Sequence, residues 1–85
     1  MIIKTPEEVF IDWVEKYNCS ITVSTTKMWG VHYVGIIKMK GEMIGFGDAH
    51  KKYERARTSA YKLMFHVMTS MLYPDQKVKV MLVTA

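Results

Sequence analysis

Residues 47–72 read GDAHKKYERARTSAYKLMFHVMTSML, and this stretch decides the fold. It predicts a long helix from Ala49 to Leu72, because apolar side chains recur along it at helical spacing. Asp48 can cap the first turn of that helix. Alanines in the apolar stripe are small, so the helix can approach a β-sheet closely. The predicted stripe consists of Tyr53, Ala56, Ala60, Leu63, Met64, Val67 and Met71.

The start of this predicted helix carries cations where a helix favours anions. Lys51 and Lys52 fall in or near its first turn, and Arg55 follows. Each cation at a helix N-terminus costs roughly 0.3–1 kcal/mol. A phosphate would offset that cost, because the free backbone N–H groups of a helix start attract anions. The alternative is that lysine has a good helix propensity and is only solvated here. We expect phosphate binding at this position.

The residues before this stretch predict a first helix followed by three strands. Thr5-Pro6-Glu7-Glu8 has the residue types of a capped helix start. Apolar side chains then continue at helical spacing through Tyr17. Alternating β-branched and apolar side chains predict strands over Ser20–Trp29, Tyr33–Lys40 and Met43–Phe46. Gly30-Val31-His32 is the predicted loop between the first two strands, and Gly41-Glu42 is the predicted hairpin turn between the last two.

The residues after the long helix predict a turn at 73–76 and a last strand over Lys77–Thr84. A three-stranded sheet with both helices on one face would bury both apolar stripes. We therefore expect an α+β fold of the order α-β-β-β-α with an extra C-terminal strand. Residues 1–85 should form one domain with its core in 5–72.

Composition describes an ordinary globular chain with an uneven charge. Of the 85 residues, 49% are hydrophobic and 24% are charged, and the net charge is +4. Residues 38–85 hold most of the positive charge, which favours an acidic partner such as a phosphate backbone. The alternative is a solvated basic surface. A lone Cys19, no apolar run of membrane-spanning length and no signal-peptide pattern predict a protein of the cytoplasm.

The residue types of catalysis and metal binding do not fall into recognisable patterns. His32, His50, His66 and Cys19 lack metal-ligand spacing. Gly45-Phe46-Gly47 lacks the third glycine of a dinucleotide site and the lysine of a P-loop. We therefore expect no enzyme, no metal and no cofactor.

The order of elements resembles a double-stranded-RNA-binding domain over about residues 5–72. The resemblance is carried by Pro6, Phe10 and Asp12 in the first helix, by Gly30-Val31-His32, by Gly45-Phe46-Gly47, by Lys51-Lys52, and by the alanines of the last helix. It implies that the first helix and the loop meet successive minor grooves while the lysines clamp phosphates between them. The RNA-binding residues that we expect are Lys51, Lys52, Arg55, His50, Arg57, Lys62, His32 and Asp12.

Structured or double-stranded RNA is thus the first expected partner, and a second copy of the chain is the next. The last strand needs a neighbour for its backbone groups, either at an edge of the sheet or in a second copy. The expected homodimer interface consists of Met68, Met71, Leu72, Val78, Val80 and Leu82. An interaction module of the same fold that binds no RNA, with Ile11 in its contact surface, is the alternative function.

The small size of the chain suits an accessory role. Small phage proteins that neutralise a host RNA-dependent defence are one class that fits, and antitoxin-like inhibitors of a host ribonuclease are an example. In that case the ribonuclease toxin is a further protein partner, and the host cytoplasm is the location.

Overall fold

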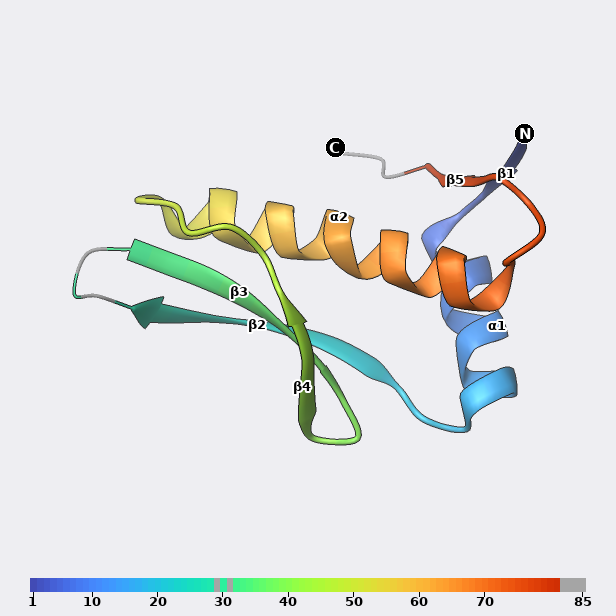
Figure 1. Cartoon of the computed structure of the whole chain (residues 1–85), viewed down its shortest axis with the longest axis horizontal. Helices are drawn as coiled ribbons and strands as arrows, with labels where there is room; N and C mark the ends of the chain where they lie inside the picture. Colours follow the sequence, from blue (N-terminus) through green and yellow to red (C-terminus); the bar gives the residue numbers. More distant parts are fainter. Residues whose placement is uncertain (29, 31, 82–85) are drawn as a thin grey trace. The chain divides into compact units, whose positions relative to one another are not determined.

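The structure, a computed structural model, describes residues 1–28, 30 and 32–81. Within them, two helices and five strands follow one another along the chain (Figure 1). The elements are β1 (Ile2–Lys4), α1 (Pro6–Tyr17), β2 (Ile21–Met28), β3 (His32–Met39), β4 (Glu42–Phe46), α2 (Tyr53–Leu72) and β5 (Val78–Val80). The predicted α+β class, with two helices and a three-stranded antiparallel sheet, is confirmed. Strand β1 was not predicted.

Contacts along the chain divide it into two compact units. The sheet unit is Ile21–Met64, and the terminal unit is Met1–Ser20 together with the chain from Phe65 onward. Helix α2 begins in the sheet unit and ends in the terminal unit. The prediction that the chain forms one domain stays a prediction.

The sheet unit is built on an antiparallel sheet with the strand order β2-β3-β4. Strands β3 and β4 are joined by Lys40 and Gly41, which have φ angles of 53° and 78°. Positive φ at both central residues is the requirement of a two-residue type I′ hairpin turn. The predicted turn at Gly41-Glu42 was therefore one residue late, because Glu42 already pairs with Met39 in the ladder.

The first part of α2 packs against β3 through side chains of minimal size. Ala56 and Ala60 are fully buried. Gly35 of β3 lies so near them that an added Cβ would overlap the Cβ of Ala60 and lie 2.8 Å from the Ala56 carbonyl oxygen. The predicted close approach of the alanine stripe to the sheet is confirmed. Whether α1 covers the same face stays a prediction.

Helix α1, in the terminal unit, has hydrogen bonds to its free backbone groups at both ends. The Glu8 N–H donates to the Thr5 hydroxyl at 3.3 Å, and the Thr5 N–H donates to the Glu8 carboxylate at 3.3 Å. This is the predicted capping box. Asn18 ends the helix in a left-handed conformation, with φ 52°, and its N–H donates to the Val14 carbonyl at 2.8 Å.

Strands β1 and β5 pair with each other in parallel, which corrects our prediction for the last strand. Ile2 lies opposite Val78 and Lys4 opposite Val80 (Figure 1). The predicted neighbour of the last strand was an edge of the three-stranded sheet or a second copy of the chain. The actual neighbour is a short apolar segment that precedes the first helix. Residues 82–84 of the predicted strand lie outside the described residues.

A polar cluster connects three segments of the terminal unit. The Asp12 carboxylate accepts hydrogen bonds from the Tyr73 hydroxyl and from the Lys4 ammonium group, the latter at 3.3 Å. These bonds, that of Tyr73 above all, lower the pKa of Asp12. Burial and the neighbouring carboxylate raise the pKa of Tyr73. The ionised Asp12 carboxylate thus joins α1 to β1 and to the segment that follows α2.

The buried face of α2 differs from the predicted stripe at both ends. Tyr53 is 45% exposed and Met71 is 40% exposed, whereas Phe65 and Met68 are buried. The prediction assumed that the whole length of the helix packs against the sheet. In the terminal unit the partner is instead α1, where Phe10 meets Phe65 edge-on at a centroid distance of 5.3 Å. Val14 of α1, an apolar residue, is also half exposed.

Candidate functional site

Helix α2 begins later than predicted, which changes the position of the two lysines. It starts at Tyr53, and the Ala56 N–H donates to the Lys52 carbonyl at 3.2 Å, so Lys52 is the residue that precedes the first turn. Residues up to His50 are held beside β3, because His50 and Tyr33 exchange two backbone hydrogen bonds of 2.7 and 2.9 Å. The helix cannot begin until the chain leaves that strand. Asp48 lies too early to cap it.

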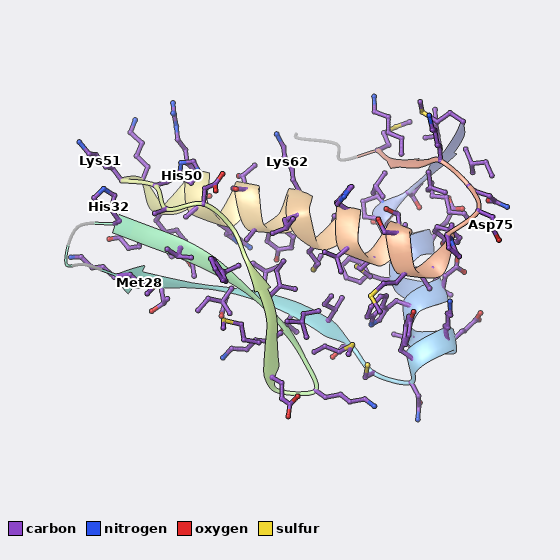
Figure 2. The ribbon with its side chains drawn as sticks, viewed as in Figure 1. Met28, His32, His50, Lys51, Lys62 and Asp75 are labelled. Atoms are coloured by element: carbon purple, nitrogen blue, oxygen red, sulfur yellow. The ribbon has the colours of Figure 1, made fainter. Side chains whose placement is uncertain are left out.

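Five of the predicted side chains line one hollow of about 480 Å³, which we call the basic hollow. Its lining residues are His32, Ala49, His50, Lys51, Lys52 and Arg55. His32 begins β3, the next four belong to the segment before α2, and Arg55 lies in the first turn of the helix. Figure 2 shows the labelled His32, His50 and Lys51 gathered at the same end of the sheet unit.

The lysines and the arginine of the basic hollow have no acidic partner among the described residues. Within residues 1–28, 30 and 32–81 the one ion pair joins Lys4 to Asp12 in the terminal unit. Lys51, Lys52 and Arg55 are exposed. Their charges are therefore available to an external anion.

The backbone at the start of α2 adds to the same electrostatic field. The N–H groups of the first helical turn have no partner within the helix. Lysine carries no hydrogen-bond acceptor, so Lys52 cannot cap them as Thr5 caps α1. The positive end of the helix dipole and three cationic side chains consequently lie together, with Glu54 as the one acidic residue of the first turn.

A second hollow of about 460 Å³ adjoins the first and contains both signs of charge. This mixed hollow is lined by Asp48, His50, Glu54, Arg55, Thr58, Ser59 and Lys62. It shares His50 and Arg55 with the basic hollow. Lys62 was among the predicted binding residues, whereas Glu54, Thr58 and Ser59 were not. Thr58 lies four residues after Glu54, and Ser59 lies four residues after Arg55 and three before Lys62, so helical spacing is the signal that would have grouped them.

Two predicted RNA-binding residues are not brought to these hollows. Arg57 lies over the ring of Tyr61, with its guanidinium carbon 5.4 Å from the ring centroid. Asp12 belongs to the terminal unit, where its carboxylate is bonded to Lys4 and Tyr73. Arg57 thus lies outside both hollows, and the Asp12 carboxylate is hydrogen-bonded within the terminal unit; their role in RNA binding stays a prediction.

The predicted dimer residues fall into three groups. Met68 is fully buried and belongs to the core, so its assignment to an interface was wrong. Met71 is 40% exposed, while Leu72, Val78 and Val80 are half-buried. Leu82 lies outside the described residues. The dimer itself stays a prediction.

A third hollow of about 440 Å³ is almost entirely apolar. This apolar hollow is lined by Met28, Val34, Ile36, Met43, Phe46, Gly47, Asp48 and Ala49. Phe46 is 64% exposed and Met43 is 59% exposed. Both lie on β4, an outer strand of the sheet. The face of the sheet around them is an exposed hydrophobic surface.

Comparison with known protein families, curated proteins and solved structures finds no match for this chain. Among the described helices, none is long and apolar enough to cross a membrane. The described residues also contain no group of three or more His, Cys, Asp or Glu side chains that could hold a metal ion. The hollows and their charges are thus the features of the molecule that indicate a function.

Proposed function

We propose that this chain is a cytoplasmic RNA-binding protein that holds RNA phosphates in the basic hollow. One observation carries the proposal: Lys51, Lys52 and Arg55 line a single hollow with the two histidines and have no acidic partner among the described residues. Three cations without an ion-pair partner among the described residues lie beside the start of α2 and repel one another in the empty protein. A phosphate group relieves that repulsion and accepts hydrogen bonds from the first turn of α2.

The resemblance to double-stranded-RNA-binding domains supports RNA over other polyanions. In that family, a lysine cluster at the last helix contacts the phosphates between two minor grooves. The order α1-β2-β3-β4-α2 is compatible with it. Because such domains contact 2′-hydroxyl groups and A-form geometry, we expect structured RNA to bind more tightly than duplex DNA at the same salt concentration. Equal affinities for the two duplexes would contradict the family assignment.

Measuring RNA affinity as a function of salt tests the proposal. Lys51→Gln with Lys52→Gln should weaken the binding of a structured RNA and reduce the slope of log affinity against log salt by about two, because each lysine that neutralises a phosphate adds about one to that slope. The matched control is Lys77→Gln with Lys79→Gln, which removes the same charge from exposed positions in the terminal unit. If both pairs lower the affinity equally, net charge alone drives binding and the basic hollow is not the site.

A protein-interaction module is the second candidate, and the apolar hollow favours it. Solvent-exposed Met43 and Phe46 on one sheet face are typical of a surface that another protein covers. A second copy of the chain, or a ribonuclease partner as predicted from size and charge, would be such a protein. Binding through this surface would depend weakly on salt, whereas phosphate binding weakens steeply. Phe46→Ser should then abolish binding of the protein partner and leave RNA affinity unchanged.

A further inference from the structure

We infer that the mixed hollow is a nucleobase site that takes an unpaired guanine of the bound RNA. The inference rests on the proposed function, because the RNA must first be held in the adjoining basic hollow. It adds base recognition to a contact that phosphate binding alone would leave independent of sequence.

Backbone hydrogen bonds hold the segment on one side of the mixed hollow, and helix α2 forms the other side. The segment that carries Asp48 and His50 is attached to β3 at both ends: the Gly47 N–H donates to the Gly35 carbonyl at 2.9 Å, and His50 bonds to Tyr33. Gly47 also lies against α2, since a Cβ there would come within 3.3 Å of the Ser59 hydroxyl. Its volume of about 460 Å³ lies in the range of small-ligand sites.

The side chains of the mixed hollow present both hydrogen-bond acceptors and donors. Asp48 and Glu54 supply carboxylates, and Arg55 and Lys62 supply cationic N–H groups. In the part of the chain that the structure describes, no ion pair joins these four residues. Their carboxylate acceptors and cationic N–H donors are consequently available to a ligand that offers both donors and acceptors.

Guanine is the base that matches this combination. Its Hoogsteen edge offers the two acceptors N7 and O6, which arginine and lysine recognise. Its Watson–Crick edge offers two adjacent donors, N1–H and the N2 amino group, which suit a carboxylate. Adenine, cytosine and uracil each place an acceptor on the edge that would face Asp48 and Glu54. In a duplex the Watson–Crick edge is occupied, so the base must come from a loop, a bulge or an end.

The shared residues explain how one RNA can use both hollows. His50 and Arg55 line each of them. A phosphate in the basic hollow therefore lies beside the nucleotide whose base enters the mixed hollow. Phosphate contacts set the register, and the base contact gives the specificity.

Base analogues test the inference without changing the protein. The probe is a hairpin RNA whose loop contains uridines and a single guanosine, measured at physiological salt. Replacing that guanosine by inosine removes the N2 amino group, and replacing it by 7-deazaguanosine removes N7. We expect each replacement to lower the affinity about tenfold. Unchanged affinity with both analogues would overturn the inference while the proposed function stands. Failure of every RNA to bind would overturn both.

Protein variants then test whether the carboxylates of Asp48 and Glu54 contact the guanine. Asp48→Asn with Glu54→Gln should abolish the preference for guanosine over inosine, with the fold checked by circular dichroism. The control is Lys51→Gln with Lys52→Gln, which should weaken both RNAs equally and keep their ratio. A carboxylate variant that is folded and still prefers guanosine by the original factor would refute the assignment of the site. If that variant does not fold, the two analogues on the unaltered chain decide the question.

Discussion

The two helices of this chain begin in opposite ways. Helix α1 follows Thr5, whose hydroxyl accepts a backbone hydrogen bond, and carries Glu7 and Glu8 in its first turn. Helix α2 follows Lys52, which has no acceptor, and Lys51 precedes it. At the start of α1, side chains of the same segment bind the free backbone N–H groups, and this stabilises the helix. At the second start, three cationic side chains and the free first-turn N–H groups outnumber the single carboxylate of Glu54, so this end keeps an excess of positive charge that costs stability and favours an anion.

The largest expected effect comes from the packing that holds the start of α2 on the sheet. Gly35→Ala places a Cβ against Ala60, where neither backbone can move easily, so the free energy of unfolding should fall by about 1–3 kcal/mol. Urea denaturation measures the change. Gly45→Ala is the matched control, because its Cβ would lie 3.6 Å from Ile37, an ordinary contact. Equal stability of the two variants would show that the close approach is not required.

Removing the cap of α1 should have the next largest effect. Thr5→Ala leaves the Glu8 N–H without its acceptor and breaks the capping box, so the chain should lose about 1 kcal/mol of stability. Thr5→Ser keeps the hydroxyl and should lose much less. Thermal unfolding followed by circular dichroism distinguishes them. Similar losses in both variants would mean that the methyl group of Thr5, rather than its hydroxyl, stabilises this start.

The corresponding change at α2 should have the opposite sign. Lys52→Asp gives this helix an N-cap acceptor and a negative charge, so we expect a gain of about 0.5–1 kcal/mol in stability together with weaker RNA binding. Lys77→Asp, outside both helices, controls for net charge. If Lys52→Asp lowers stability, the first-turn N–H groups of α2 do not lack an acceptor, and the proposed difference between the two helix starts is wrong.

The smallest effect concerns the carboxylate of Asp12, which is hydrogen-bonded within the terminal unit. Hydrogen bonds from Tyr73 and Lys4 lower the pKa of Asp12 below its ordinary value of 3.8. The ionised form is thus favoured in the folded state, so its contribution is present above pH 3.8 and is lost as the pH falls through the folded pKa. Tyr73→Phe should move the Asp12 pKa upward in an NMR titration. The Asp12 side chain is 35% exposed, so the accompanying stability change is small.

Local signals predicted the parts of the fold that depend on neighbouring residues. The Thr5–Glu8 capping box and the helical spacing through Tyr17 were predicted correctly from adjacent residue types. So was the packing of small residues in α2, because Ala56 and Ala60 recur at helical spacing on one face. These features need no knowledge of distant partners.

The errors concern residues whose structure is set at long range. Nothing near Ile2 and Ile3 indicates a strand, because their pairing partner is β5 at the other end of the chain. Helix propensity favoured a start near Ala49, but the bridge from His50 to Tyr33 keeps that segment extended. The same bridge brings His32 and His50 to one hollow, and helical spacing could not have revealed it. Five lining residues of the basic hollow were among the predicted binding residues, whereas Glu54, Thr58 and Ser59 of the mixed hollow were recognised only from the structure.

The pairing of β1 with β5 has a consequence for the order of events during synthesis. Residues 2–4 leave the ribosome well before residues 78–80, which cover their backbone groups. The nascent chain therefore carries an unpaired apolar strand while the residues between the two strands are made. Closing a loop that contains most of the chain is slow compared with forming a local hairpin. The sheet unit, whose strands are joined by short connections, can form while β1 still lacks its partner.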